Sequence, residues 1–168
     1  LDRLDFVTIE GIRQAMSDQI LTDSPAARAE AMRGRIETVA EQLFRSLGYQ
    51  KTTVADIARE LGMSPANIYR FYPSKSAINE AIAQRILGAM LAEAESVAQG
   101  PGPASTRLRR LFSRMFEHKL EVFFQERRLH DMVTAAMEEH WGVIARHMAG
   151  VQAVIARIIS DGIAAGEF

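Results

Sequence analysis

Residues 53–78 read TVADIARELGMSPANIYRFYPSKSAI, and this stretch decides what kind of fold the chain has. Apolar residues recur at intervals of three and four on either side of Gly62, and Pro73 closes the second set. The pattern predicts two short helices joined by a tight turn. Helices this short are marginal alone, so neighbouring helices must hold them in place.

The residues at the turn predict how the two helices cross. Ala58 is small where the second helix would cross the first, and Gly62 permits the left-handed backbone of a tight turn. Ile68, ten residues after Ala58, would anchor the second helix to the core. This spacing predicts a helix-turn-helix unit, whose second helix is free to enter a major groove. Thr53 and Asp56 predict a capping box at the start of the first helix.

The polar side chains of this unit suit DNA. Asn67 and Arg70 can each make paired hydrogen bonds to base edges, Asn67 to adenine and Arg70 to guanine. The alternative is a helical hairpin in an ordinary core with polar residues in water, and the combination of signals favours DNA binding. The donors expected to bind phosphate are Thr52, Thr53, Ser64, Tyr69, Tyr72 and Lys75.

Helical periodicity continues along almost the whole chain, and no strand alternation is sustained, so the predicted fold is all-α. A Gly/Pro-rich break falls at residues 99–103. We expect an extra helix within residues 1–24, a three-helix DNA-binding domain at 25–74 and a helical body for ligand binding and dimerisation at 75–168. The helices are expected at 4–21, 25–47, 53–61, 64–72, 74–98, 105–124, 129–138 and 141–163, with Ser24, Thr53, Ser64, Ser74 and Ser105 as caps.

Composition excludes several classes of protein. The 168 residues are 48% hydrophobic and contain no cysteine, which excludes a disulfide framework and thiolate metal sites. No unbroken apolar run approaches the ~18–20 residues of a membrane helix, so we expect a soluble, cytoplasmic protein without membrane contact. Net charge is −1, yet residues 26–85 carry nine basic and six acidic side chains, hence +3 there and −4 elsewhere. A locally basic segment is consistent with nucleic-acid binding.

The run from 35 to 82 resembles the TetR family of transcriptional regulators. The family signature is roughly GYxxTTVxDIAxxxGVSxGTLYxHFxSKExL, and residues 48–78 here read GYQKTTVADIARELGMSPANIYRFYPSKSAI. The departures are Asn67 for the usual Thr, Tyr72 for the usual Phe and Ser76 for the usual Glu. The first of these changes would alter which bases are read.

The resemblance implies a role for each matching position. It puts Thr53, Ser64, Tyr69, Tyr72 and Lys75 at phosphate-contacting positions, with Arg35 near the DNA backbone. Base readout would fall to Pro65, Ala66, Asn67 and Arg70.

The resemblance also implies a mechanism for the whole chain. The expected protein is a repressor that binds double-stranded operator DNA as a homodimer. A small apolar or amphipathic effector would shift the long helix at 75–98 and release the operator. The alternative is a helical dimerisation module whose helix-turn-helix no longer binds DNA.

The region after residue 104 is rich in Phe and Met, a pattern that is core more often than pocket, although both side chains also suit an adaptable apolar pocket. Four histidines (118, 130, 140 and 147) lack the HExxH spacing of a zinc site, and no Gly-rich phosphate loop occurs. We therefore expect no enzyme, no metal site and no cofactor. The predicted pocket residues are Phe112, Met115, Phe116, Met132, Met137, Trp141 and Ile144.

The two ends raise a further expectation. Residues 1–23 carry a net charge of −3 and an apolar stripe, so they should pack on protein rather than reach DNA. TetR-like bodies usually close with a further long helix after the one that here ends near Gly162, and the N-terminal helix would cover the surface it leaves. Equally open is that the sequence is only the ordered part of a longer chain. The stripe consists of Phe6, Ile9, Ile12, Met16 and Ile20.

Overall fold

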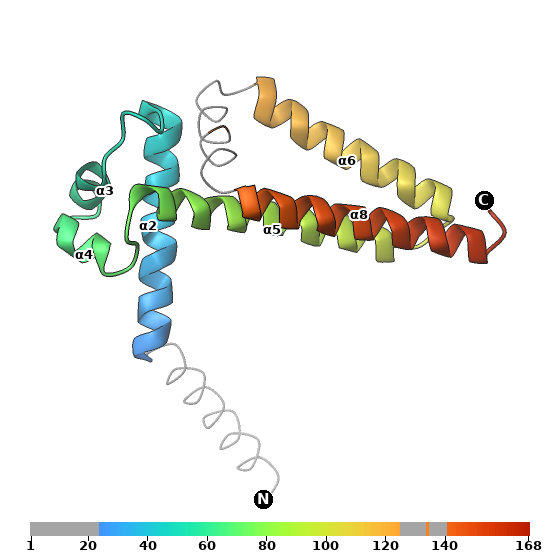
Figure 1. The fold of residues 1–168 in the computed structure, drawn as a ribbon, viewed down its shortest axis with the longest axis horizontal. Helices are drawn as coiled ribbons and strands as arrows, with labels where there is room; N and C mark the ends of the chain where they lie inside the picture. Colours follow the sequence, from blue (N-terminus) through green and yellow to red (C-terminus); the bar gives the residue numbers. More distant parts are fainter. Residues whose placement is uncertain (1–23, 125–133, 135–140) are drawn as a thin grey trace, which may run out of the picture.

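The structure, a computed structural model, describes residues 24–124, 134 and 141–168. These residues form six helices and no strand, which confirms the all-α fold class (Figure 1). The predicted helices at 4–21 and 129–138 lie outside the described residues. The six helices are α2 (Pro25–Leu47), α3 (Val54–Glu60), α4 (Pro65–Tyr69), α5 (Lys75–Gln99), α6 (Ala104–Phe124) and α8 (Trp141–Ala164).

The first four of these helices begin where the sequence places a capping side chain. In each case the side-chain oxygen of a Ser or Thr accepts a hydrogen bond from a backbone N–H three residues later, which satisfies a donor that the helix leaves unpaired. The predicted caps are confirmed for Ser24, Thr53, Ser64 and Ser74.

The start of α6 differs from the prediction. Its first residue is Ala104, and Ser105 lies inside the first turn instead of capping it. The carboxylate of Glu167 accepts hydrogen bonds from the backbone nitrogens of Ala104 at 2.9 Å and Ser105 at 3.2 Å. These bonds hold the pKa of Glu167 below its usual value, and the negative charge suits the positive end of the helix. Ser105 was therefore wrongly predicted as the cap.

The first core lies among α2, α3, α4 and the first half of α5, and α2 crosses α5 there (Figure 1). Phe44 of α2 meets the ring of Tyr49 edge-on, with 5.1 Å between ring centroids. Ile78 and Ile82 of α5 complete the same core and are fully buried. The predicted domain boundary between residues 74 and 75 therefore lies before Ile78 and Ile82, which still belong to this core. The division into two domains stays a prediction.

The second core lies between the end of α5, α6 and α8. Helix α8 runs beside α5 and packs against α6 (Figure 1). A Cβ atom at Gly150 would lie 2.6 Å from the Leu91 side chain, so glycine lets α8 approach α5 closely. The buried residues of this core are Ala94, Ala98, Ala104, Leu111, Val154 and Ile158.

One face of α8 is apolar and exposed. Within Gly142–Ala164, a stretch of 18 residues has a mean hydropathy of 1.3, and only 22% of that stretch is buried. By length and composition this helix is apolar enough to cross a membrane, although its sequence contains no unbroken apolar run of ~18–20 residues. It packs against α5 and α6 as a helix of a helical body does, so its composition alone does not indicate a membrane.

Candidate DNA-binding site

Helix α3 is fixed at its start by the predicted capping box. The backbone nitrogen of Asp56 donates to the Thr53 hydroxyl at 3.2 Å, and the Thr53 nitrogen donates to the Asp56 carboxylate at 3.0 Å. The Thr53 hydroxyl itself donates to the same carboxylate at 2.6 Å, which is the main cause of the lowered pKa of Asp56. Arg59 adds an ion pair at 2.6 Å. The negative charge of Asp56 is therefore paired with Arg59 of the same helix.

The turn between α3 and α4 has the backbone that the sequence predicts. Gly62 has a φ of +67°, in the left-handed region that glycine adopts most easily. The nitrogen of Met63 donates to the Ala58 carbonyl at 2.9 Å, which closes the turn onto α3. Ala58 is 1% exposed, so the small side chain allows the close crossing.

Helix α4 has only five residues, and one of them anchors it. Ile68 is completely buried in the first core, whereas Tyr69 beside it is 53% exposed. Arg70 is also exposed and has no ion-pair partner among the described residues. Pro65 and Ala66 are exposed at the start of the helix, and Asn67 is half-buried. The helix therefore presents Tyr69 and Arg70 to solvent, with Asn67 at the edge of that face.

Lys75 lies at the start of α5, and its side chain reaches back to the loop before α3. Its ammonium donates to the carbonyls of Tyr49 at 2.8 Å and Thr52 at 3.1 Å, and it lies 4.3 Å from the centre of the Tyr49 ring. These contacts place a positive charge beside the start of α3. Lys75 thus holds the α2–α3 loop to α5, a role that the sequence analysis did not foresee.

Two of the predicted phosphate contacts lie inside the protein, and the prediction is corrected for them. Thr52 is completely buried, and its hydroxyl donates to the Gly48 carbonyl at 2.9 Å. Tyr72 is 7% exposed, and its hydroxyl donates to the Glu37 carboxylate at 2.6 Å. Burial, followed by that bond, raises the pKa of Tyr72 to about 12. Neither hydroxyl is available to phosphate in this arrangement.

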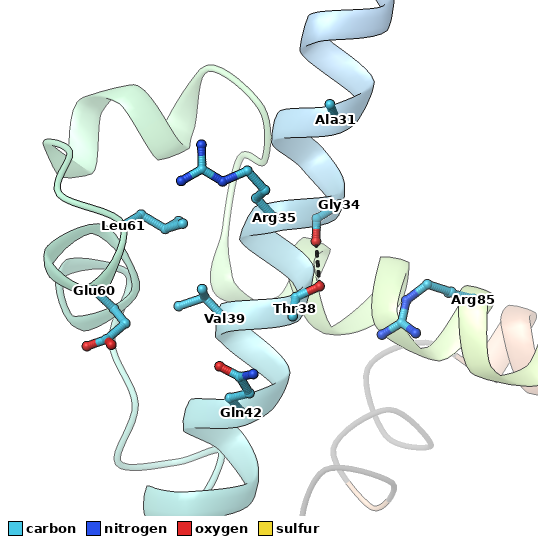
Figure 2. Close-up of a pocket in the computed structure, with 9 residues that line it drawn as sticks. All are labelled: Ala31, Gly34, Arg35, Thr38, Val39, Gln42, Glu60, Leu61 and Arg85. Carbon is cyan, nitrogen blue, oxygen red and sulfur yellow. Dashed lines mark hydrogen bonds between the residues drawn. The ribbon is translucent and has the colours of Figure 1, made fainter.

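The remaining predicted contacts lie on the surface. Arg35 extends from α2 into the groove between that helix and the α3–α4 pair (Figure 2). Ser64 is exposed, and its hydroxyl oxygen accepts from the Asn67 nitrogen at 3.4 Å. Thr53 is exposed at the start of α3. Arg35, Thr53, Ser64, Tyr69 and Arg70 therefore offer polar groups to a bound duplex.

Sequence reasoning missed two residues that support this surface. Arg33 of α2 donates to the Phe71 carbonyl at 2.7 Å and lies over the Tyr72 ring, 5.4 Å from its centre. Glu37, one turn later, binds the Tyr72 hydroxyl. The signal was a row of charged residues four apart on α2, from Arg33 to Arg45, although the row does not reveal what it contacts.

Four of the seven predicted pocket residues have side chains that the structure describes, all of them on α6 or α8. Phe112 and Phe116 are 51% and 62% exposed, because they lie on the face of α6 turned away from the second core. Met115 packs against that core, and Ile144 is half-buried. Met132, Met137 and the side chain of Trp141 lie outside the described part of the chain. The pocket therefore stays a prediction for all seven residues.

A different hollow lies between α5 and α8. It has a volume of about 340 Å³ and is lined partly by Leu87, Leu91 and His147, none of them predicted. The Nδ1 atom of His147 lies 3.2 Å from the Leu87 carbonyl. Within the residues that the structure describes, no group of three or more His, Asp or Glu side chains gathers as a metal site would require.

Comparison with known families decides what these features belong to. Residues 36–82 match the bacterial regulatory proteins of the tetR family, and residues 104–168 match the tetracyclin repressor-like C-terminal domain. The chain belongs to the TetR family. It is therefore a transcriptional regulator, and both family and fold are those of DNA-binding regulators rather than of enzymes.

Solved structures of the TetR family share the fold of this regulator. One from Marinobacter aquaeolei VT8 has a TM-score of 0.61 and 19% identity, covering 84% of this chain and 73% of its own. A TetR/AcrR regulator from Thermobifida fusca YX-ER1 has a TM-score of 0.57 and 25% identity, and the match covers 82% of this chain and 73% of that regulator. Thermus thermophilus FadR, a TetR family repressor in complex with lauroyl-CoA, has a TM-score of 0.56 and 22% identity, and the match covers 81% of this chain and 70% of FadR.

One curated relative matches over a shorter stretch. The nucleoid occlusion factor SlmA of Mannheimia succiniciproducens is 32% identical over an alignment of 84 positions that covers 42% of this chain. The match spans 39% of the length of that relative. What the relative does as a whole protein is therefore not carried over to this TetR-family chain.

Proposed function

We propose that this protein is a ligand-responsive repressor that binds operator DNA as a homodimer in the cytoplasm. One observation carries the proposal: in α4, Ile68 is completely buried while its neighbour Tyr69 is half-exposed. Arg70, the residue that ends the helix, is exposed and has no ion pair among the described residues. A helix held this firmly, with its polar face free, has the form needed for the major groove.

The exposed polar groups divide into two tasks. Tyr69, Ser64, Thr53 and Arg35 can bind phosphate and set the orientation of the protein. Arg70 and Asn67 can read base edges, because both side chains can make paired hydrogen bonds. Lys75 adds positive charge beside α3 while it holds the loop, so its substitution would weaken binding to all sequences.

The proposed dimer suits the geometry of DNA. Two recognition helices on one side of a duplex must lie about one helical turn apart, ~34–36 Å. The exposed apolar side chains of α6 and α8 give the body a surface suited to contact with another subunit. Sedimentation at micromolar concentration tests this step, and a monomer would contradict it.

The effector is proposed to be apolar or amphipathic. Two things support this: the apolar side chains Leu87 and Leu91 beside the hollow between α5 and α8, and the acyl-CoA held by the FadR neighbour. The direct test adds lauroyl-CoA to the protein and follows thermal unfolding, then release of bound duplex. Free CoA serves as the matched control, because it lacks the acyl chain.

Salt dependence separates the proposal from its alternative, a dimerisation module that no longer binds DNA. A protein making about six to ten phosphate contacts loses ~10³–10⁵ in affinity between 50 and 200 mM salt. Fluorescence anisotropy should show this slope with a duplex that the protein selects from a randomised library. If no duplex is selected and none binds at 50 mM salt, the repressor proposal is wrong.

A further inference from the structure

A chain of polar contacts joins three parts of the protein around Glu37 of α2. One carboxylate oxygen, Oε1, accepts the hydrogen bond from Tyr72, in the segment between α4 and α5, at 2.6 Å. The other, Oε2, accepts from the Arg85 Nε atom of α5 at 3.3 Å. A single side chain thus contacts both the end of the helix-turn-helix unit and the long helix that follows it.

The surroundings of Glu37 favour these contacts over contacts with water. Its side chain is 14% exposed, so water competes little for the carboxylate, whereas Arg85 is 51% exposed. Arg85 also pairs with Glu41, one turn further along α2, and Glu41 pairs with Arg45 at 2.9 Å. Hydrogen bonds to a charged carboxylate are stronger than those between neutral groups. Glu41 reaches Arg85 without contacting Tyr72, which makes it a natural control.

A second contact fixes the same segment to α2. Arg33, one turn before Glu37, donates to the Phe71 carbonyl at 2.7 Å. The segment that follows α4 is therefore tied to α2 at two neighbouring points. Arg85 lies ten residues beyond Lys75 in α5, which is about 15 Å along the helix axis. Any tilt of α5 against α2 must change the Arg85 contacts while the start of α5 stays fixed.

We propose that Glu37 is a positioning residue that couples the orientation of α5 to Tyr72 and so to the placement of the recognition helix α4. The proposal rests on the proposed DNA-binding function and specifies its regulation. When α5 tilts and Arg85 leaves Glu37, the carboxylate loses a neutralising cation and its bond to Tyr72 changes. The segment after α4 then shifts, and this shift changes how α4 fits DNA.

The test is a double-mutant cycle between two residues that do not touch. Tyr72→Phe and Arg85→Met are measured alone and together, with Glu37 present and in a Glu37→Ala background. The readout is affinity for the duplex that the wild-type protein selects from a randomised library. With Glu37 present, the fold-loss of DNA affinity in the double variant should be smaller than the product of the two single fold-losses, by about threefold or more. In the Glu37→Ala background the two losses should simply multiply.

The matched control uses the neighbouring carboxylate. In a Glu41→Ala background the non-additivity should persist, since Glu41 contacts Arg85 but not Tyr72. The general loss of one positive charge in Arg85→Met cancels within the cycle. If Glu37→Ala does not fold, Glu37→Gln takes its place, because it keeps an acceptor for Tyr72 but loses the charge that pairs with Arg85.

A second readout does not depend on DNA. Amide hydrogen exchange of a peptide covering residues 70–74 should rise in Arg85→Met when Glu37 is present and not when it is replaced. If the wild type binds DNA but Tyr72→Phe and Arg85→Met act independently in every background, Glu37 does not couple them. The proposed function would then remain intact. If the wild type binds no duplex, the proposed function is wrong, and hydrogen exchange alone then decides the coupling.

Discussion

The two cores of this protein bury side chains of different size. Around the helix-turn-helix unit the fully buried set includes Phe44, Ile57, Ile68 and Ile82. Around α6 and α8 three of the six core residues are alanine, while large apolar side chains such as Phe116, at 62% exposure, lie outside. Among the described residues, the first region therefore buries its large side chains, whereas the second leaves several of them on the surface.

The largest effect expected from this difference concerns two phenylalanines. Phe44→Ala should lower the free energy of unfolding by about 3–5 kcal/mol, because it opens a cavity in a filled core. Phe116→Ala should change it by less than about 0.5 kcal/mol, because the side chain is mostly in water. Urea unfolding followed by circular dichroism measures both, and equal losses would contradict the comparison.

The next effect concerns DNA affinity. Arg70→Ala should lose ~1–3 kcal/mol of discrimination at particular operator positions, because a base-reading guanidinium is removed. Arg109→Ala removes the same charge from an exposed site on α6 and should leave base preference unchanged. Tyr69→Ala should instead weaken binding to all sequences alike. Binding measured across single-base operator variants would show whether the roles divide in this way.

A smaller effect separates two serines that the sequence treats alike. Ser74 caps α5, and its oxygen accepts from the Ala77 nitrogen at 3.0 Å, so Ser74→Ala should cost about 1 kcal/mol. Ser105 does not cap α6, and Ser105→Ala should cost only about a few tenths of a kcal/mol. Thermal or urea unfolding of the two variants checks this. An equal or larger loss at Ser105 would contradict this difference between the two serines.

The smallest effect is a dependence on pH. The pKa of Glu167 is lowered in the folded protein, so its contribution to stability is present above the unfolded value of 4.5 and is lost as pH falls through the folded value. Glu167→Gln should therefore lower Tm at pH 6, and its difference from wild type should shrink as the pH falls below 4.5. A constant difference down to pH 3 would contradict the role of its charge.

The sequence predicts correctly those features that depend on contacts between residues close together in the chain. The caps at Ser24, Thr53, Ser64 and Ser74 form with groups three residues away, so the helix starts are visible in the sequence. The left-handed Gly62 is visible for the same reason. These local signals, with the buried Ile68, are enough to define the helix-turn-helix unit.

The errors come from contacts between residues far apart in the sequence. Glu167 replaces Ser105 as the cap of α6 from 63 positions beyond Ala104, and Tyr72 meets Glu37 across 35 positions. A tyrosine at the surface of a short helical segment looks like a phosphate donor until its partner on another helix is known. The exposure of Phe112 and Phe116 is equally hidden in the sequence, because the apolar pattern does not reveal which face of α6 the neighbouring helices cover.

Helix α5 is common to both cores, with Ile78 and Ile82 buried in one and Ala94 and Ala98 in the other. Its 25 residues correspond to a rod about 37 Å long at ~1.5 Å per residue. Pivoted at one end, a rod of this length turns a tilt of about 5° into a displacement of about 3 Å at the other end. That displacement is comparable to a hydrogen-bond length, so a tilt of a few degrees at one core is enough to make or break a hydrogen bond beside the other.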